Sequence, residues 1–283
     1  PASLSKKDHH GVVSAVLTNC WRGGDSVVDA AEVFAVNCVS VNAELVPTCI
    51  AALSKQFLEI PVNPPPQRPD AQGGDEDATV LASDGVHRVL SRVIETFPTG
   101  STTLLQQLKD RFPHKRRDVE MQRCFLGNAL QVLEYVPQIL APLLDEVIDR
   151  LVQIDVEIVV PDFVGDGDGG HEGGDGLFDM ELADTEKSVE QRENTVLADK
   201  LDAMMLLTLE FIKSVCDSSK GPIDRDTLFQ TLLDIFERRI LTTFRSKYTQ
   251  FLLFYASHFR TRYIQNFLSL LLKITTGNTH PDE

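Results

Sequence analysis

The glycine-rich stretch GDGDGGHEGGDG, residues 165–176, comes closest in residue types to a ligand-binding loop. A phosphate-binding loop ends in Gly-Lys-Ser or Gly-Lys-Thr, whose lysine and hydroxyl hold phosphate and magnesium, and this stretch contains no lysine. A calcium-binding EF-hand loop starting at Asp166 needs glycine at its sixth position and glutamate at its twelfth, where this chain has His171 and Leu177. We therefore expect a solvated, disordered acidic insertion, with weak cation association as the alternative.

Basic side chains concentrate around one predicted turn between two helices. They are Lys109, Arg111, His114, Lys115, Arg116, Arg117 and Arg123. One interpretation is a solvated turn whose cations stabilise a helix carboxyl end. Because no aromatic residues are interleaved with the cations, the pattern disfavours a surface for single-stranded nucleic acid. The other interpretation is a contact with an acidic protein surface, made by Lys115, Arg116 and Arg117.

The sequence contains no catalytic or metal-binding signature. The cysteines are widely separated and form no Cys-x-x-Cys pair; they are Cys20, Cys38, Cys49, Cys124 and Cys216. We expect them to be reduced core residues, with a reactive thiol as the alternative. No Gly-x-Ser-x-Gly, His-Glu-x-x-His, kinase or dinucleotide-binding signature occurs. The sequence therefore predicts no enzyme, no metal and no cofactor, although a site assembled from distant residues stays open.

The net charge of −15 is concentrated in one segment. Residues 155–195 carry thirteen acidic and two basic side chains, a net −11, and the rest of the chain is close to neutral at −4. A negative field of this size disfavours direct DNA binding by the chain as a whole. No run of eighteen apolar residues occurs, and the amino-terminal residues lack the pattern of a secretory signal. We expect a protein of the cell interior without a membrane span.

Apolar residues recur at helical spacing along most of the chain. The pattern predicts helices over His10–Leu17, Val27–Val36, Ala43–Phe57, Ser83–Glu95, Leu104–Phe112, Val119–Tyr135, Ile139–Ile154, Val196–Cys216, Leu228–Thr242, Ser246–Ser257 and Tyr263–Ile274. Pro137 cannot donate a backbone hydrogen bond, so we expect it at the first turn of its helix. Helices of this length with short connections indicate an all-α fold. We interpret it as an α-solenoid of HEAT-like antiparallel helix pairs, although a globular bundle has the same local pattern.

Breaks in the helical pattern divide the chain into segments. Residues 1–60 are expected to form an amino-terminal helical lobe, and residues 61–79 a loop rich in proline, glycine and acidic residues. Residues 80–154 and 196–274 are expected to form HEAT-like helix pairs. The acidic, glycine-rich insertion at residues 155–195 separates these two sets of pairs.

Two groups of apolar residues need separate interpretation. Inside the insertion, Leu177, Phe178 and Met180 either dock on the solenoid or form a short motif for a partner. A dense aromatic run follows near the carboxyl end: Phe244, Tyr248, Phe251, Phe254, Tyr255, Phe259, Tyr263 and Phe267. Because its spacings are three and four residues, we expect most of it to pack in the core.

Several stretches together resemble the RNA polymerase I-specific transcription initiation factor family, of the transcription initiation factor IA type. They are YVPQILAPLLDEVIDRLVQIDVEI, then GLFDM, then ADKLDAMMLLTLEFIKSVC, then LFQTLLDIFERRILTTFRSKYTQFLLFYASHF. The resemblance extends from about Val80 to Lys273, and no stretch in it is a catalytic signature.

The resemblance implies an adaptor of stacked HEAT-type helix pairs with a variable acidic insertion. Such an adaptor binds RNA polymerase I subunits and joins them to the promoter-bound core or selectivity factor on ribosomal DNA. It also implies a nuclear and nucleolar protein regulated by phosphorylation, and a chain that ends before the family's last helices. The alternatives are a HEAT-like scaffold or transport adaptor of another pathway, or a helical regulatory subunit of a kinase or phosphatase.

Overall fold

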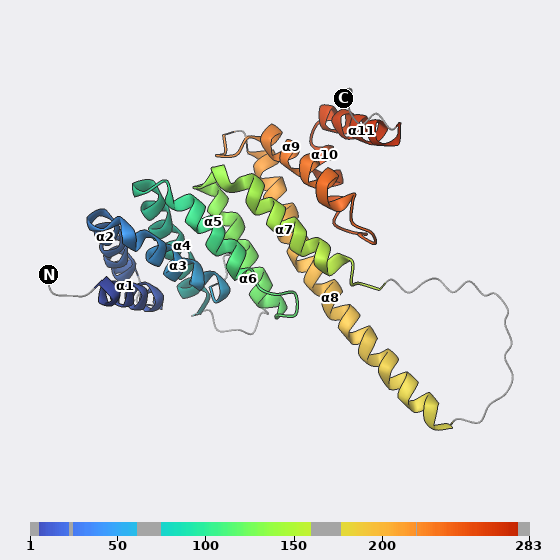
Figure 1. Cartoon of the computed structure of the whole chain (residues 1–283), viewed down its shortest axis with the longest axis horizontal. Coiled ribbons are helices and arrows are strands. Elements are labelled where there is room, and N and C mark those ends of the chain that lie inside the picture. The colour runs from blue at the N-terminus through green and yellow to red at the C-terminus, as the bar shows by residue number, and fades with distance from the viewer. Residues whose placement is uncertain (1–5, 23–24, 61–74, 160–176, 219, 277–283) are drawn as a thin grey trace.

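The computed structural model describes residues 6–22, 25–60, 75–159, 177–218 and 220–276. Every regular element in these ranges is helical, which confirms the all-α prediction. The α-helices, labelled in Figure 1, are α1 (Lys6–Asn19), α2 (Asp25–Val41), α3 (Val46–Lys55), α4 (Asp75–Thr96), α5 (Gly100–Arg111), α6 (Val119–Gln131), α7 (Leu140–Asp155), α8 (Leu177–Asp217), α9 (Arg225–Ile235), α10 (Phe251–His258) and α11 (Thr261–Thr275). None of the helices in the described ranges is long and apolar enough to cross a membrane.

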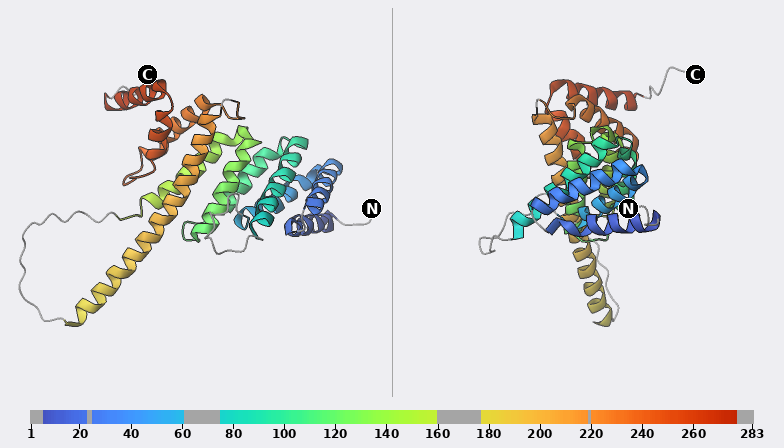
Figure 2. Two further views of the ribbon diagram at one scale, coloured as in Figure 1. Left: turned by 180° about the vertical axis from the view of Figure 1, so that it is seen from behind. Right: turned by 90° about the vertical axis from the view of Figure 1, so that its left-hand side faces the viewer.

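Alternate helices along the chain pack against one another, so that the helices form two rows. In one row, α1 packs on α3, α3 on α5, α5 on α7 and α7 on α9. In the other row, α2 packs on α4, α6 on α8 and α8 on α10. The result is an elongated array with α1 at one end and α11 at the other (Figure 1 and Figure 2). This arrangement is the predicted α-solenoid of HEAT-like pairs.

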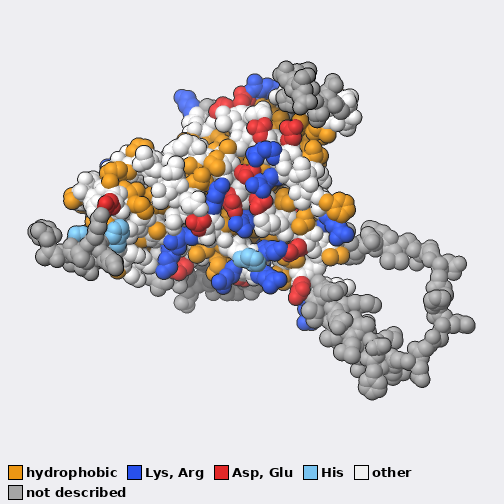
Figure 3. Space-filling view, viewed as in Figure 1, with side chains coloured by type: hydrophobic (Ala, Val, Ile, Leu, Met, Phe, Trp, Pro, Cys, Tyr) orange, Lys and Arg blue, Asp and Glu red, His pale blue; other side chains and the backbone are white. Residues whose placement is uncertain are grey.

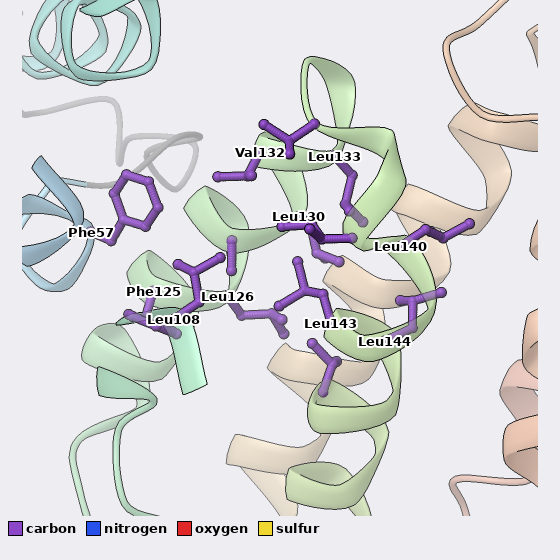
Figure 4. Close-up of a cluster of buried hydrophobic side chains, with 14 of the residues drawn as sticks. Phe57, Leu108, Phe125, Leu126, Leu130, Val132, Leu133, Leu140, Leu143 and Leu144 are labelled. Atoms are coloured by element: carbon purple, nitrogen blue, oxygen red, sulfur yellow. The ribbon is translucent and has the colours of Figure 1, made fainter. Parts of the chain in front are cut away.

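The apolar stripe of α7 shows how sequence spacing builds the core. Its buried side chains recur every three or four residues and are Leu140, Leu143, Leu144, Val147, Ile148 and Leu151. Pro137 opens the 3-10 turn η5 (Pro137–Ile139) directly before α7, as expected for a residue without a backbone N–H. Figure 4 shows Leu143 of α7 facing Leu126 and Leu130 of α6. Burial of these stripes against each other holds neighbouring helices together.

Helix α8 begins earlier than the sequence pattern predicts. The expected start is Val196, whereas α8 begins at Leu177, so residues 177–195 of the predicted insertion are helical. No proline or glycine interrupts this stretch, and strong helix formers such as glutamate, alanine, leucine and lysine are frequent in it. Helix propensity therefore accounts for a helix that begins before the apolar pattern does. The first part of α8 extends away from the array in Figure 1.

Two other predicted features fall partly or wholly outside the described residues. The glycine-rich stretch 165–176 is one, and the side chains of Leu177, Phe178 and Met180 are the other. Helix α4 begins at Asp75 and not at the predicted Ser83, so the end of the predicted 61–79 loop is also helical.

A buried polar network connects α4 to α6. The imidazole of His87 in α4 bonds through Nε2 to Asn128 Oδ1 at 2.9 Å and through Nδ1 to the hydroxyl of Tyr135 at 2.8 Å. The Asn128 amide nitrogen in turn donates to the carbonyl oxygens of Ile60 at 2.6 Å and Cys124 at 2.7 Å. His87 and Asn128 are both almost fully buried. The network satisfies these polar groups and ties the amino-terminal helices to α6.

A second buried polar group, Asp155, joins the end of α7 to the loop before α10. Its Oδ2 accepts hydrogen bonds from the backbone N–H groups of Lys247, Tyr248 and Thr249, at 2.8 to 3.1 Å. The hydroxyls of Ser246 and Thr249 also donate to this oxygen, at 2.9 and 2.6 Å. The carboxylate thus satisfies backbone donors that precede a helix, as a capping residue does.

The aromatic run near the carboxyl end does not form one core face, and the prediction was wrong on this point. Phe244 is 85% exposed and Phe251 is 49% exposed, whereas Tyr263 is 1% exposed and stacks on Phe229 of α9. Spacing of three and four residues defines a common face only within one helix. Here the run is divided among the loop before α10, α10 itself and α11, so its side chains point in different directions.

Candidate partner-binding site at the α5–α6 turn

The turn between α5 and α6 is positioned by hydrogen bonds on both sides. Pro113 follows α5, and Asp118 caps the start of α6 by accepting a hydrogen bond from a backbone N–H at 3.0 Å. The buried amide of Gln122 donates to the carbonyl oxygens of Pro113 at 3.2 Å and His114 at 2.9 Å. Residues 114–117, which we name the basic turn, are therefore presented on a defined backbone.

Lys115 is connected to the interior and is not a free surface cation. Its ammonium group pairs with Glu157, which follows α7, and its side chain is 28% exposed. Its carbonyl oxygen accepts a hydrogen bond from Nζ of Lys200 in α8. Lys200 is almost fully buried, and this burial lowers the pKa of its ammonium group below the ordinary value. Lys115 thus links the basic turn to α7 and α8.

Arg116 and Arg117 are the exposed arginines of the basic turn, and His114 beside them is exposed as well. Neither forms an ion pair with a carboxylate in the part of the chain that the structure describes. Figure 3 shows basic side chains and a histidine gathered along the lower edge of the molecule. A guanidinium group offers paired N–H donors that match the two oxygens of a carboxylate. Of the three predicted contact residues, the structure leaves these two available to a partner.

The other cations of the predicted cluster have internal contacts or lie apart from the turn. Arg111 donates through Nε to the side-chain oxygen of Gln107 at 3.0 Å, and it faces a hollow beside α3. Arg123 lies 3.8 Å from Glu120 within α6. The positive surface offered by the turn is therefore smaller than the sequence suggests.

Sequence reasoning missed Glu157 and Lys200, which lie 42 and 85 residues from Lys115 along the chain. A signal for Lys200 exists: it occupies the same helical face as Met204 and Thr208, which are buried. A lysine on an apolar face indicates a buried amine that needs an acceptor. No comparable signal marks Glu157, which lies in a strongly acidic stretch.

Arg239 illustrates an arginine whose role is internal. It forms a two-pronged pair with Asp145, with contacts of 2.8 and 2.7 Å, and its remaining nitrogen donates to Asp149 at 2.6 Å. Hydrogen bonding to Arg239 lowers the pKa of the Asp145 carboxyl. This pairing joins α7 to the π-helical turn η6 (Phe236–Ile240) and leaves Arg239 unavailable for a partner.

The structure gives the cysteines no chemical activation. Burial raises the pKa of each of the five thiols, and that of Cys49 to about 12, so they are uncharged at neutral pH. Across the described ranges, no three side chains of the histidine, cysteine, aspartate and glutamate types come together as metal ligands would.

The ion pair of Lys115 predicts a small but measurable coupling. In a double-mutant cycle of Lys115→Gln and Glu157→Gln, we expect a coupling energy of about 0.5 kcal/mol, because both side chains are partly exposed to solvent. Urea unfolding of the four proteins measures it. A coupling energy of zero would mean that Lys115 is free in solution and belongs with Arg116 and Arg117 as a possible contact.

Comparison with known proteins adds sequence and structural relatives. The family described as RNA polymerase I specific transcription initiation factor RRN3 matches residues 2–283. The RNA polymerase I-specific transcription initiation factor RRN3 of Mus musculus is 27% identical over 301 residues, which cover 97% of this chain and 45% of that protein. The Schizosaccharomyces pombe factor rrn3 is 26% identical over 294 residues, covering 95% of this chain and 46% of that protein.

A solved structure has the same fold. The crystal structure of RNA polymerase I transcription initiation factor Rrn3 superposes with a TM-score of 0.67 at 14% sequence identity, over 100% of this chain and 55% of that one. The chain therefore spans slightly less than half the length of the two curated relatives.

Proposed function

The chain belongs to the RNA polymerase I specific transcription initiation factor family RRN3, and we propose that it acts in initiation by RNA polymerase I as a binding adaptor. The observation that carries this proposal is the family match over residues 2–283. In this role the chain binds polymerase subunits and helps connect them to the promoter-bound factor on ribosomal DNA, in the nucleus and nucleolus. Because the chain spans less than half of its curated relatives, the proposal concerns the surfaces that this portion presents.

Binding, and not catalysis, is the mode of action that fits the molecule. A solenoid presents a long side surface on which each helix pair adds contact area, which suits an adaptor. Direct DNA binding is not part of the proposal, because a net charge of −15 opposes association with a polyanion. The partner surface is therefore protein.

We assign one polymerase contact to Arg116 and Arg117. They are exposed, free of carboxylate partners in the described chain, and positioned by a turn that is hydrogen-bonded on both sides. An acidic patch on a polymerase subunit would neutralise both guanidinium groups. Lys115 supports this contact by holding the turn against α7 and α8 and does not itself touch the partner.

The test is binding of purified RNA polymerase I to the double variant Arg116→Glu/Arg117→Glu. We expect its affinity to fall at least about tenfold, because like charges replace attracting ones at the contact, and the wild-type affinity to weaken as salt is raised. The matched control is Lys213→Glu/Lys220→Glu, which makes the same change in net charge at two exposed lysines elsewhere.

The control variant should bind as the wild type does, and both variants should unfold at the wild-type temperature. An equal loss in the two variants would assign the effect to net charge. Unchanged binding of Arg116→Glu/Arg117→Glu would remove the turn from the interface. If the wild-type chain fails to bind the polymerase at all, the adaptor role of this portion is wrong.

A further inference from the structure

A hollow of about 400 Å³ runs along α3 between α1 and α5. Figure 1 shows α3 lying between these two helices. Its walls include Ser14 and Thr18 from α1, Thr48, Ala51 and Lys55 from α3, and Arg111 from α5. The small side chains of Ala51 and Ala52 line the hollow from the middle of α3. Its volume is in the range of sites that hold small ligands or peptide side chains.

The charge of this hollow differs from that of the chain. The whole protein has a net charge of −15, yet the lining contains two cations and no carboxylate. The cations are Lys55 and Arg111, the last residues of α3 and α5. Neither pairs with a carboxylate in the described ranges, whereas arginines such as Arg88 and Arg239 do.

One structural explanation for these cations is the helix dipole, since a cation at a helix carboxyl end is stabilising. That explanation accounts for charge at the two helix ends and not for the empty space beside them. The hydroxyls of Ser14, Thr18 and Thr48 add polar groups along the hollow, and Ala51 and Pro47 add an apolar floor. A hollow lined by two cations, hydroxyls and a few apolar side chains matches a peptide bearing acidic side chains.

We propose that this hollow binds an acidic peptide segment of a partner protein, with carboxylates of the segment paired to Lys55 and Arg111. A small apolar side chain of the segment lies over Ala51. Nucleic acid fits less well, because no aromatic side chain lines the hollow to stack on a base. This surface lies on α1, α3 and α5, and its lining residues are different from Arg116 and Arg117 of the proposed polymerase contact.

The test is fluorescence anisotropy of the full chain with a labelled peptide, Ser-Glu-Glu-Val-Glu-Glu-Ser, at low salt. We expect saturable binding with a Kd on the order of 100 μM, typical of a small contact area. The same peptide with glutamine at every glutamate position should bind at least about tenfold more weakly, because its side chains cannot neutralise the cations.

Two variants test separately the role of the two cations and the role of the volume of the hollow. Lys55→Gln/Arg111→Gln removes both cations, and Ala51→Leu fills the hollow while keeping them. Each should weaken peptide binding at least about tenfold. The matched control is Lys213→Gln/Lys220→Gln, which removes two exposed cations elsewhere in the chain and should bind the peptide within about twofold of wild type. Circular dichroism and thermal unfolding verify that all variants are folded.

Three results would overturn the proposal. The first is no saturable binding of the acidic peptide. The second is equal binding of the glutamate and glutamine peptides, or of the wild type and Lys55→Gln/Arg111→Gln. The third is equally tight binding of a labelled single-stranded oligonucleotide of the same net charge, since the hollow would then select negative charge and not a peptide.

Discussion

Replacing Asp155 with alanine is expected to lower the free energy of unfolding by about 3 kcal/mol, because the change leaves five hydrogen-bond donors, two of them on the buried Thr249, without their acceptor. Five hydrogen bonds end on Oδ2 of this carboxylate, three from backbone N–H groups and two from hydroxyls. Asp155 and Thr249 are fully buried, so the two hydrogen bonds from Thr249 are the hardest for water to replace. Urea unfolding followed by circular dichroism measures the loss.

Two further variants make the Asp155 result specific. Asp155→Asn keeps an acceptor oxygen but removes the charge, so it should cost about half as much, since charged acceptors bind donors more strongly. Asp234→Ala removes an exposed aspartate from α9 and should change the free energy of unfolding by less than about 0.5 kcal/mol. If Asp155→Ala costs no more than Asp234→Ala, the carboxylate does not hold the loop before α10 to α7.

The pH dependence of the Asp155 contribution follows from its hydrogen bonds. Burial alone would raise the pKa of the carboxyl, but hydrogen bonds from Thr249, Lys247 and Tyr248 outweigh burial and leave the pKa below its ordinary value. The contribution of Asp155 to the free energy of unfolding is therefore fully present above the pKa of its carboxyl in the unfolded chain, about 3.9. This contribution is lost as the pH falls through the lower pKa that the carboxyl has in the folded chain.

Asp155 also shows what the sequence pattern can predict and what it cannot. By composition it is the first acidic residue of the predicted insertion, residues 155–195, which implies a carboxylate in contact with solvent. By spacing it continues the buried face of α7, four residues after Leu151 and seven after Ile148. An acid at such a position indicates a buried carboxylate that needs donors. The donors themselves lie about ninety residues away, at Lys247 to Thr249, and helical spacing carries no information over that distance.

The range of helical spacing also limits what the sequence predicts about the candidate site. Charge clustering located the basic turn, and proline together with the helical period placed it between two helices. Which of its cations reach solvent depends on Glu157 and Lys200, brought in by α7 and α8. The prediction for the aromatic run was wrong for a related reason: most of its members follow one another at three and four residues but belong to different elements. Local periodicity predicts helices well, whereas exposure depends on which helices become neighbours.

His87 leads to a second stability prediction, which concerns mildly acidic pH. Burial lowers the pKa of its imidazole to about 4, against an opposing effect of the hydrogen bond to Asn128. Because the Asn128 amide nitrogen donates to carbonyl oxygens, its Oδ1 must accept from His87 Nε2, and Nδ1 then accepts from the Tyr135 hydroxyl. This assignment uses the neutral imidazole, with both ring nitrogens satisfied. A second proton would face the Tyr135 oxygen in a buried site.

We therefore expect the folded chain to lose about 3 kcal/mol of stability through His87 as the pH falls from about 6.5, the ordinary histidine pKa, to about 4. The sign follows from the lowered pKa: the unfolded chain takes up the proton first, so falling pH favours unfolding. Above about pH 7 this effect is absent. The window lies above the one for Asp155, so the two contributions separate on one pH titration.

Two non-titrating variants test the His87 prediction by urea unfolding from pH 7 to pH 4. His87→Gln supplies a donor for Asn128 and an acceptor for Tyr135, so it should stay near wild-type stability at pH 7 and lose the extra acid sensitivity. His87→Leu removes the acceptor of the Tyr135 hydroxyl and leaves Asn128 Oδ1 only the 3.4 Å hydrogen bond from Ser83, so it should cost about 2 kcal/mol at pH 7 and also lose that sensitivity. If the free energies of unfolding of the wild type and His87→Gln fall in parallel down to pH 4, His87 does not take up a proton on unfolding. The assignment of a buried neutral imidazole would then be wrong. If His87→Gln and His87→Leu lose the same free energy of unfolding relative to wild type at every pH, the hydrogen bonds of His87 do not contribute. Its stabilising role would then be the packing of its ring against Phe57, at 5.0 Å between centroids.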